Sequence, residues 1–192
     1  GAENIHQTAA VFAKIINAQD KQTEIKLSQD LRHLKQKALE INKKVMIELN
    51  NQFITPMDRG DIQELSVLLF KLTKRIVKTN SKLQIYAIDI QADDWLIGSA
   101  TTLENITKVL VEMMQALKDG NHQIISSGDQ RADEFDENAI EDLRRAMKEM
   151  YSGNYDTMTI LKLKEVYKNI ESAIDTSVSI ADLIMQITVK DM

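Results

Sequence analysis

Three carboxylates near the carboxyl end of the chain are spaced for work on a hard cation. Glu171 and Asp175 stand four positions apart and Asp182 follows seven positions later, so in a helix all three lie on one stripe. Side chains at i and i+4 can offer oxygens to the same divalent or ferric ion. The alternative is a boundary stripe that pairs with lysines of a neighbouring helix. Carboxylates at an apolar seam are costly without compensation, which favours an ion or access of water.

The histidines suggest a second metal chemistry. Each follows an acidic residue by three positions, as in the Glu-x-x-His pattern of di-iron bundles: Glu3 and His6, Asp30 and His33, Asp119 and His122. A di-iron site also needs two more helical glutamates in register, and His122 follows Gly120 and Asn121 outside the predicted helices. We therefore interpret the histidines as exposed surface residues rather than as ligands of a ferritin-like oxidase.

Composition excludes several other functions. The chain has no cysteine, and hence no disulfide, thiolate metal site or cysteine nucleophile. It has no Gly-rich phosphate loop and no serine–histidine–aspartate order, so the sequence offers no enzyme mechanism. Its 24 basic and 29 acidic residues are well mixed and give a formal charge of −5, which argues against nucleic acid as a partner. No stretch approaches the roughly 20 apolar residues of a membrane span.

These residues must be positioned by helices. The 192 residues include six glycines and one proline, too few for the turns of a many-stranded fold, whereas good helix formers abound. Apolar side chains recur with helical spacing through most of the chain. The sequence therefore predicts an all-α fold, a single domain over residues 1–192 with six helices.

The predicted helices follow the apolar stripes and the breaks between them. In chain order they are 3–19, which bends or runs on into a second helix with its seam at 27–49, then 58–95, 101–120, 135–151 and 157–189. Gly98-Ser99 is interpreted as the end of the third helix, and Thr101-x-x-Glu104 as the capping box of the fourth. The polar stretch 119–133 is the longest predicted loop.

The turn between the second and third helices holds the only proline. Pro56 cannot donate a backbone hydrogen bond and disfavours a helical Thr55, so a helix arriving from Asn51 must stop. Asp58 is a good N-cap, and Asp61 stands in the capping-box position. Turn chemistry alone requires only the proline and a cap.

The sequence of this turn is more specific than that chemistry. The stretch FITPMDRGDIQEL resembles the Phe-Ile-Thr-Pro-x-Asp-Arg-x-Asp-Ile signature of PhoU-like proteins of the Pit-accessory type. The matching residues are Phe53, Ile54, Thr55, Pro56, Asp58, Arg59, Asp61 and Ile62. A second stretch, IESAIDTSVSIADLI, resembles the family's Leu-Glu-x-x-x-Asp segment followed by Ala-Asp. The resemblance spans about 25–190.

The resemblance implies an internal repeat. PhoU-like proteins consist of two three-helix repeats, which would place repeat one at about 2–97 and repeat two at about 98–192 of this chain. A shift of 101 residues gives a faint echo in agreement, since it places Leu49 on Met150 and Leu69 on Ile170.

The resemblance also implies carboxylate pairs that bind metal clusters in each repeat. Register from the signature places the positions of repeat one at Lys35, Leu39, Phe70 and Lys74, none of them acidic. The positions of repeat two fall at Asp136, Ile140, Glu171 and Asp175. We therefore expect no cluster and, at most, one weakly bound metal ion, held by Asp136, Glu171 and Asp175.

The family is tied to inorganic phosphate uptake. The resemblance implies a non-enzymatic regulator or accessory domain of inorganic phosphate transport that binds a membrane transporter of the Pit type. We expect a cytoplasmic protein, held at the inner face of the membrane through that transporter; a homo-oligomer is compatible with the sequence. The alternative is a carboxylate metal-binding or metal-storage bundle. The start Gly1-Ala2 is typical of a tag remnant, and a piece of a longer polypeptide would begin in this way.

Overall fold

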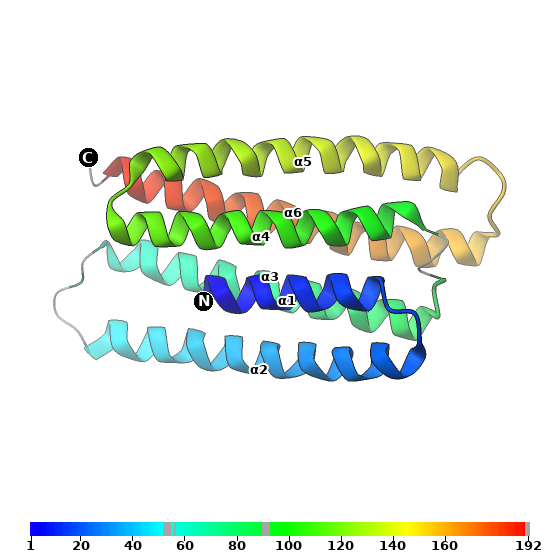
Figure 1. The fold of residues 1–192 in the computed structure, drawn as a ribbon, viewed down its shortest axis with the longest axis horizontal. Coiled ribbons are helices and arrows are strands. Elements are labelled where there is room, and N and C mark those ends of the chain that lie inside the picture. The colour runs from blue at the N-terminus through cyan, green and yellow to red at the C-terminus, as the bar shows by residue number, and fades with distance from the viewer. Residues whose placement is uncertain (52–54, 56, 90–92, 191–192) are drawn as a thin grey trace.

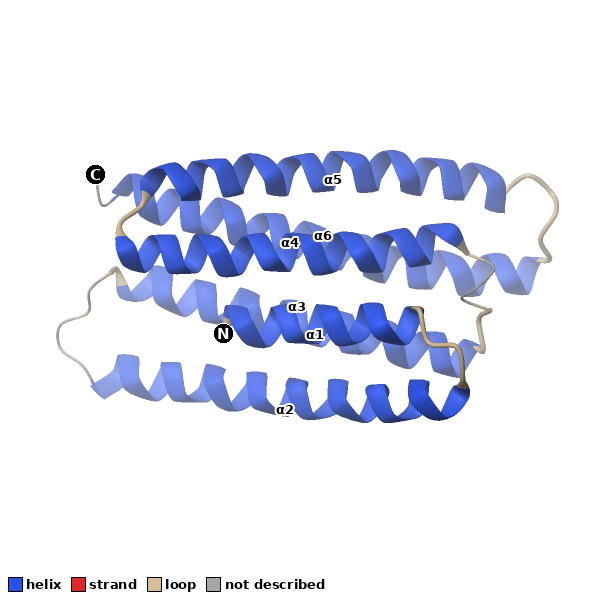
Figure 2. Ribbon diagram, viewed as in Figure 1, coloured by secondary structure: helices blue, strands red, loops and turns tan. Residues whose placement is uncertain are grey.

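The chain folds into a bundle of long helices (Figures 1 and 2). The computed structural model describes residues 1–51, 55, 57–89 and 93–190. These residues form six helices and no strand: α1 (Ala2–Ile16), α2 (Lys21–Asn51), α3 (Arg59–Tyr86), α4 (Asp94–Asp119), α5 (His122–Met150) and α6 (Thr157–Lys190). The predicted all-α, six-helix fold is confirmed.

The two halves of the bundle pair in the same way. Helix α1 packs against α4 and α3 packs against α6, so these four helices form the centre of the molecule. Helix α2 contacts α1 and α3 on one flank, and α5 contacts α4 and α6 on the other (Figure 1). Leu49 and Met150 are both buried near the carboxyl ends of α2 and α5, in agreement with the 101-residue echo. The exact repeat boundaries stay a prediction.

Burial follows this arrangement. The central helices bury large side chains completely, among them Phe12, Leu72, Leu103 and Ile180. Helix α2 lies on a flank, and of its predicted seam only Leu31, Ala38 and Leu49 are buried. A flank helix therefore keeps a narrow apolar stripe and leaves most of its surface to charged residues.

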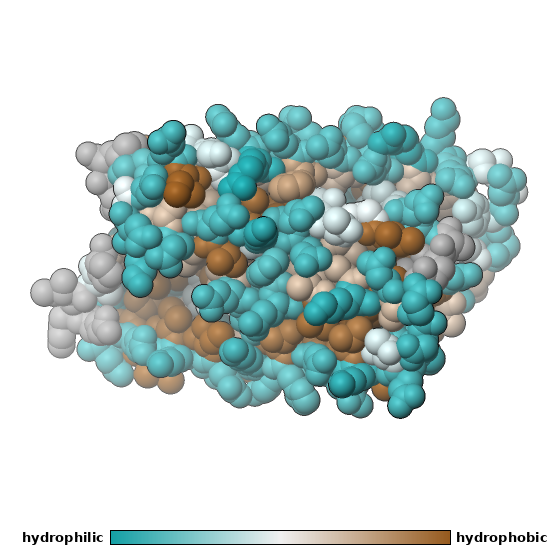
Figure 3. Space-filling view, in the orientation of Figure 1, coloured by the Kyte–Doolittle hydropathy of each residue, from teal (hydrophilic) through white to brown (hydrophobic). Residues whose placement is uncertain are grey.

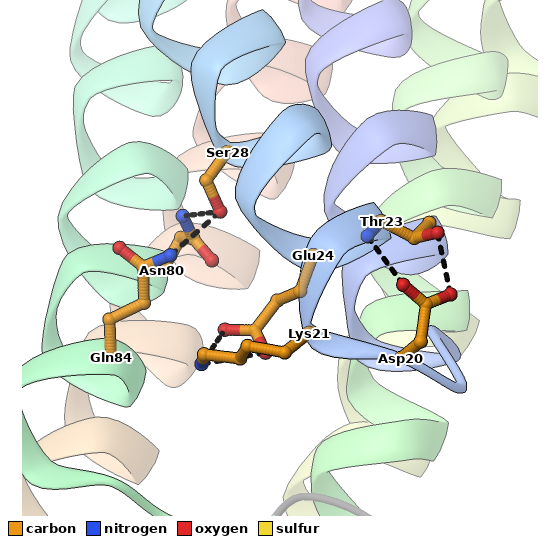
Figure 4. Close-up of polar contacts among 7 residues, drawn as sticks. All are labelled: Asp20, Lys21, Thr23, Glu24, Ser28, Asn80 and Gln84. Atoms are coloured by element: carbon orange, nitrogen blue, oxygen red, sulfur yellow. Dashed lines mark hydrogen bonds and ion pairs between the residues drawn. The ribbon is translucent and has the colours of Figure 1, made fainter.

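Acidic and amide side chains begin most of the helices. Asp20 accepts hydrogen bonds from the backbone N–H and the hydroxyl of Thr23 ahead of α2, at 2.8 and 2.6 Å (Figure 4). Asp58 caps α3 as predicted, Asp93 caps α4 and Asn121 caps α5. These caps satisfy backbone N–H groups that have no partner inside the helix.

The predicted boundary between the third and fourth helices is wrong. Helix α3 ends at Tyr86, where Ala87 adopts a left-handed conformation with φ 50°, and α4 already begins at Asp94. Gly98 and Ser99 lie inside α4, and Thr101 donates back to the carbonyl of Ile97 instead of opening a helix. The real break contains neither glycine nor proline, the residues that usually mark one.

The predicted loop at 119–133 is also wrong. Gly120 adopts φ 68° and ends α4, Asn121 caps α5, and helix then runs from His122 onward. His122 is thus helical, contrary to the sequence interpretation. Gly128 is a packing residue: a Cβ built on it would lie 2.4 Å from Cγ of Met113 on α4. Helix α1 likewise stops at Ile16, and a turn separates it from α2.

Candidate functional site

Six carboxylates of α5 and α6 lie near one another where the two helices pack, a region that we call the α5–α6 groove. They are Asp129, Asp133 and Asp136 on α5, and Glu171, Asp175 and Asp182 on α6. Their mutual repulsion shows how the helices face each other. Asp136 acts on Glu171, whereas Asp182 acts on Asp129. Antiparallel helices therefore bring two acidic stripes together, and the stripe predicted on α6 has a partner stripe on α5.

Asp136 and Glu171 of this groove hold protons more tightly than usual. Burial is the main cause of the raised pKa of Asp136, and the negative charges of Asp175, Asp133 and Glu137 add to it. Burial also raises the pKa of Glu171, with Asp175 and Asp136 as further causes. A cation entering the groove would relieve this repulsion.

Two basic side chains of the chain itself already offset part of the charge. Arg75 reaches across from α3, donates to the carbonyl oxygen of Ser172, and its charge lowers the pKa of Asp175 against the effect of burial. The charge of Lys168 likewise lowers the pKa of Glu171 against the effect of burial. Protein cations therefore offset part of the charge of the groove, but Lys168 belongs to α6 itself, so the predicted pairing with lysines of a neighbouring helix stays a prediction.

The fit to a metal ion is incomplete. Within the described ranges, no three Asp, Glu or His side chains converge as the ligands of one ion would. Asp136, Glu171 and Ile140 line a common small recess, so an isoleucine occupies the fourth family position. Oδ1 of Asp129 is buried and has no hydrogen-bond partner among the residues that the structure describes. The residues do not fit a cluster, and a single weak ion stays a prediction.

The matching positions in the first half have a different chemistry. Lys74 places its ammonium nitrogen 4.7 Å from the centre of the Phe70 ring, a cation–π contact. Lys35 is exposed and Leu39 is half-buried. None of these side chains offers an oxygen, so this half has no hard-cation site at these positions.

The signature turn ties α3 to the end of α6. Asp58 accepts from the backbone N–H of Gly60 at 2.8 Å, and the Thr55 hydroxyl donates to the carbonyl of Met57. Asp61 is buried and binds Lys190 near the carboxyl end of α6, at 2.8 and 3.0 Å. Asp61 therefore forms a long-range ion pair with Lys190, and its role in a capping box stays a prediction.

The other signature residues and the histidines form no common site among the residues that the structure describes. Arg59 stands exposed in the first turn of α3. Phe53, Ile54 and Pro56 lie outside the described residues. The histidines do not form a common site: His6 contacts the hydroxyl of Thr107 across the α1–α4 interface, whereas His33 and His122 are exposed on α2 and α5.

Sequence reasoning missed the contact between two aromatic rings at one end of the bundle. Trp95 and Tyr167 pack with ring centres 4.3 Å apart, and the Tyr167 hydroxyl donates to Asp93 at 2.6 Å. Burial and this carboxylate raise the pKa of the Tyr167 phenol, which therefore stays protonated. The residues come from α6 and from the start of α4, so no local pattern could have joined them.

It also missed an apolar hollow in the first half. The hollow has a volume of about 180 Å³ and lies between α1, α2 and α3, with Ile5, Val45, Leu65 and Phe70 among its lining. Apolar side chains gather at this place on the face in Figure 3, where α1 begins beside α2. Ser66 lines it and donates to Asn42 at 2.9 Å.

Comparison with solved structures identifies the architecture. A PhoU-like protein from Shewanella oneidensis MR-1 superposes with a TM-score of 0.87, over 98% of this chain and 96% of that chain, at 9% identity. A second Shewanella protein, described as a candidate PhoU-like phosphate regulatory protein, gives 0.84 over 98% and 95%, at 8% identity. The fold is PhoU-like. The predicted resemblance is thereby confirmed, while the Pit-accessory type stays a prediction.

Sequence comparison gives one curated relative that matches over nearly its whole length. The UPF0111 protein YkaA of Bacillus subtilis is 24% identical over 193 residues, which cover 99% of this chain and 92% of that protein. No protein-family model matches the chain. None of the described helices is long and apolar enough to cross a membrane.

Proposed function

We propose that this PhoU-like chain is a non-enzymatic regulator or accessory domain of inorganic phosphate transport. The observation that carries the proposal is the agreement of fold over nearly the whole chain with PhoU-like proteins, one of them described as a candidate phosphate regulatory protein. The signature residues Asp58 and Asp61 at the α2–α3 turn add to it. The chain acts in the cytoplasm by binding a protein partner.

The partner we propose is a phosphate transporter of the Pit type. The supporting feature is the resemblance of residues 53–62 to the Pit-accessory signature, which turn chemistry alone does not require. A regulator of this kind needs an interaction surface and no turnover, which suits a sequence without a nucleophile constellation.

Phosphate uptake and copurification test this proposal together. Cells that express the transporter with and without this chain should differ in the rate of labelled phosphate uptake, and the chain should copurify with the transporter in detergent. A matched control is an unrelated helical bundle expressed at the same level. Unchanged uptake together with no copurification would overturn the proposal.

The second candidate function is metal binding in the α5–α6 groove. It is favoured by the raised pKa values of Asp136 and Glu171, because a bound cation would stabilise the ionised carboxylates. With one family position lost to Ile140, any ion is held weakly and is removed by a chelator.

Elemental analysis decides between the candidates. Protein purified without chelator should carry no more than one metal ion per chain, and dialysis against EDTA should remove it. Asp136→Asn should lower that content, and Asp89→Asn, a substitution outside the groove, should not. Two or more equivalents of iron or zinc retained after EDTA would favour the metal-storage function.

A further inference from the structure

The outer surface of α2 and α3 carries exposed aliphatic side chains and more cations than carboxylates, although Glu40 and Glu64 are exposed beside them. Residues 65–88 of the chain hold Lys71, Lys74, Arg75, Lys78 and Lys82 and no Asp or Glu. We define the α2–α3 face by its six cations and its four exposed aliphatic residues. They are Arg32, Lys35, Lys43, Lys71, Lys74 and Lys78, with Ile25, Ile47, Val67 and Ile85.

Hydrogen bonds between the two helices align them. Ser28 accepts from Asn80 at 3.1 Å and from Gln84 at 2.9 Å, as Figure 4 shows, and Asn42 accepts from Ser66 further along. Antiparallel packing in this register puts Ile25 at the level of Ile85. The cations then lie along both helices, between aliphatic residues at the two ends.

Helical spacing places the residues of the α2–α3 face on one side. On α3, Val67, Lys71, Lys74, Lys78 and Ile85 recur at intervals of three, four and seven positions, as one stripe requires. On α2, Ile25, Arg32, Lys43 and Ile47 recur at intervals of four, seven and eleven positions. In the part of the chain that the structure describes, none of the six cations forms a salt bridge.

The second half of the molecule serves as an internal control. The residues 101 positions after the six cations are Asp133, Asp136, Arg144, Ser172, Asp175 and Ser179. The residues 101 positions after the four aliphatic side chains are Ser126, Lys148, Lys168 and Gln186. The α2–α3 face is thus apolar and cationic, whereas its ten counterparts are all polar and hold three aspartates against three basic residues, so helix packing alone does not demand its composition.

We propose that the α2–α3 face binds the surface of an anionic lipid bilayer. Exposed aliphatic residues on a cationic helical surface are the composition of helices that lie in the membrane interface. Ile85 is 75% exposed and Ile47 59%, so both side chains are available for shallow insertion.

The distribution of charge favours a lipid array over a single phosphate ion. Lys71 and Lys78 are about 10 Å apart along α3, and Arg32 and Lys43 about 16 Å apart along α2, at a rise of 1.5 Å per residue. Cations that are spread in this way do not converge on one anion. They match many mobile headgroups at once, and each cation adds to the attraction.

Vesicle sedimentation tests this inference. The chain should sediment with phosphatidylcholine vesicles that contain phosphatidylglycerol, should not sediment with phosphatidylcholine alone, and should be released by high salt because screening weakens the attraction. The variant Lys71→Glu, Lys74→Glu, Lys78→Glu should lose binding by about a hundredfold or more. Ile25→Ser with Ile85→Ser should weaken binding severalfold while leaving its salt dependence unchanged.

The matched control changes the total charge equally at exposed lysines elsewhere. Lys108→Glu, Lys118→Glu, Lys148→Glu should retain most of the binding, and circular dichroism should show that both triple variants are folded. Equal losses in the two variants, or no binding to anionic vesicles, would overturn the inference. Release by inorganic phosphate beyond that by chloride at equal ionic strength would indicate a phosphate site instead.

Two further outcomes also decide against lipid. Salt-sensitive self-association without vesicles, abolished by the α3 substitutions, would show that the face binds the acidic groove of a second copy. Capture of an acidic protein with no vesicle binding would assign the face to a protein partner. The lipid inference is separate from the proposed function, because vesicle binding needs no transporter and transporter regulation needs no vesicle binding.

Discussion

The α2–α3 pair and the α5–α6 pair take the same place in the two halves of the bundle and differ in what fills and covers them. Ser66 on α3 lines a hollow of about 180 Å³, whereas its counterpart 101 residues later, Tyr167, fills space against Trp95. Lys74 on α3 rests on Phe70, whereas its counterpart Asp175 belongs to an acidic groove.

The comparison separates what holds the fold from what is free to change. Leu69 and its counterpart Ile170 are both buried, as are Leu65 and Val166, so the apolar seam is kept in both halves. One position beyond the seam, the first half has Phe70, and the residue 101 positions later in the second half is Glu171. The two helix pairs therefore pack alike although their outer surfaces differ in charge. Residues of the apolar seam decide the packing, whereas the outer residues are free to serve binding.

The largest loss of stability should follow from removing a buried aromatic ring from the core of the second half. Tyr167→Ser gives this position the residue found at Ser66, removing a buried ring, its contact with Trp95 and its hydrogen bond to Asp93. We expect a loss of about 3–5 kcal/mol in the free energy of unfolding, measured by urea denaturation. Ser66→Ala, the control in the first half, should cost about 1 kcal/mol or less. Comparable losses would show that the two interiors are equally filled.

A smaller loss should follow from widening the contact between α4 and α5. A Cβ at position 128 would meet Met113 at 2.4 Å, so Gly128→Ala should lower stability by about 1–3 kcal/mol. The counterpart of Gly128 is Leu27, a half-buried side chain, so the close approach belongs to the second half.

Gly98→Ala is the control for this substitution. A Cβ at Gly98 would meet nothing within 4 Å, and the position is helical. The thermal midpoint should therefore rise, with a gain of about 0.5–1 kcal/mol. A rise for Gly128→Ala as well would mean that Met113 moves aside without cost.

The caps of α3 and α6 should behave alike. Asp58 accepts from the N–H of Gly60 at 2.8 Å, and Asp156 accepts from the N–H of Met158 at 2.9 Å. Replacement of either aspartate by alanine should lower the free energy of unfolding by about 1 kcal/mol, because the helix loses its N-cap. Thermal unfolding of the two variants measures this; no loss in Asp58→Ala would assign that side chain another role.

The sequence predicted those parts of the fold that depend on local spacing. The α6 range, the Asp58 cap and the all-α class follow from apolar period and capping chemistry, and all appear in the structure. The α3–α4 break was missed because Ala87 supplies a left-handed turn without glycine. Gly128 was read as a loop signal because the approach of Met113, which requires it, is a contact between helices.

The candidate site could be predicted only in part. The stripe of Glu171 and Asp175 follows from the sequence, since both belong to one helix face. Arg75 and Asp129 were missed, because one reaches the groove from α3 and the other from a stretch read as a loop. Contacts between residues about 100 positions apart carry no local signal, so the balance of charge in the groove needed the structure.

The smallest expected effect concerns the acidic groove at different pH values. Folding raises the pKa of Asp136 by burial and by the charges of Asp175, Asp133 and Glu137. A carboxyl group with a raised pKa binds its proton more tightly in the folded chain than in the unfolded chain. As pH falls from neutral through the raised pKa toward the ordinary value near 4, this group therefore adds stability, and the addition is complete below that value.

Asp136→Asn should remove that dependence. At neutral pH the variant should be more stable than the parent by less than about 1 kcal/mol, since solvent screens the groove, and below about pH 4 the difference should vanish. Lys35→Gln, at the matching position of the first half, should leave the shape of the pH profile between pH 4 and 7 unchanged. Urea unfolding across this range measures both variants. Lower stability of Asp136→Asn at neutral pH would mean that Arg75 and Lys168 already overcompensate the negative charge of the groove, so that the ionised Asp136 favours folding.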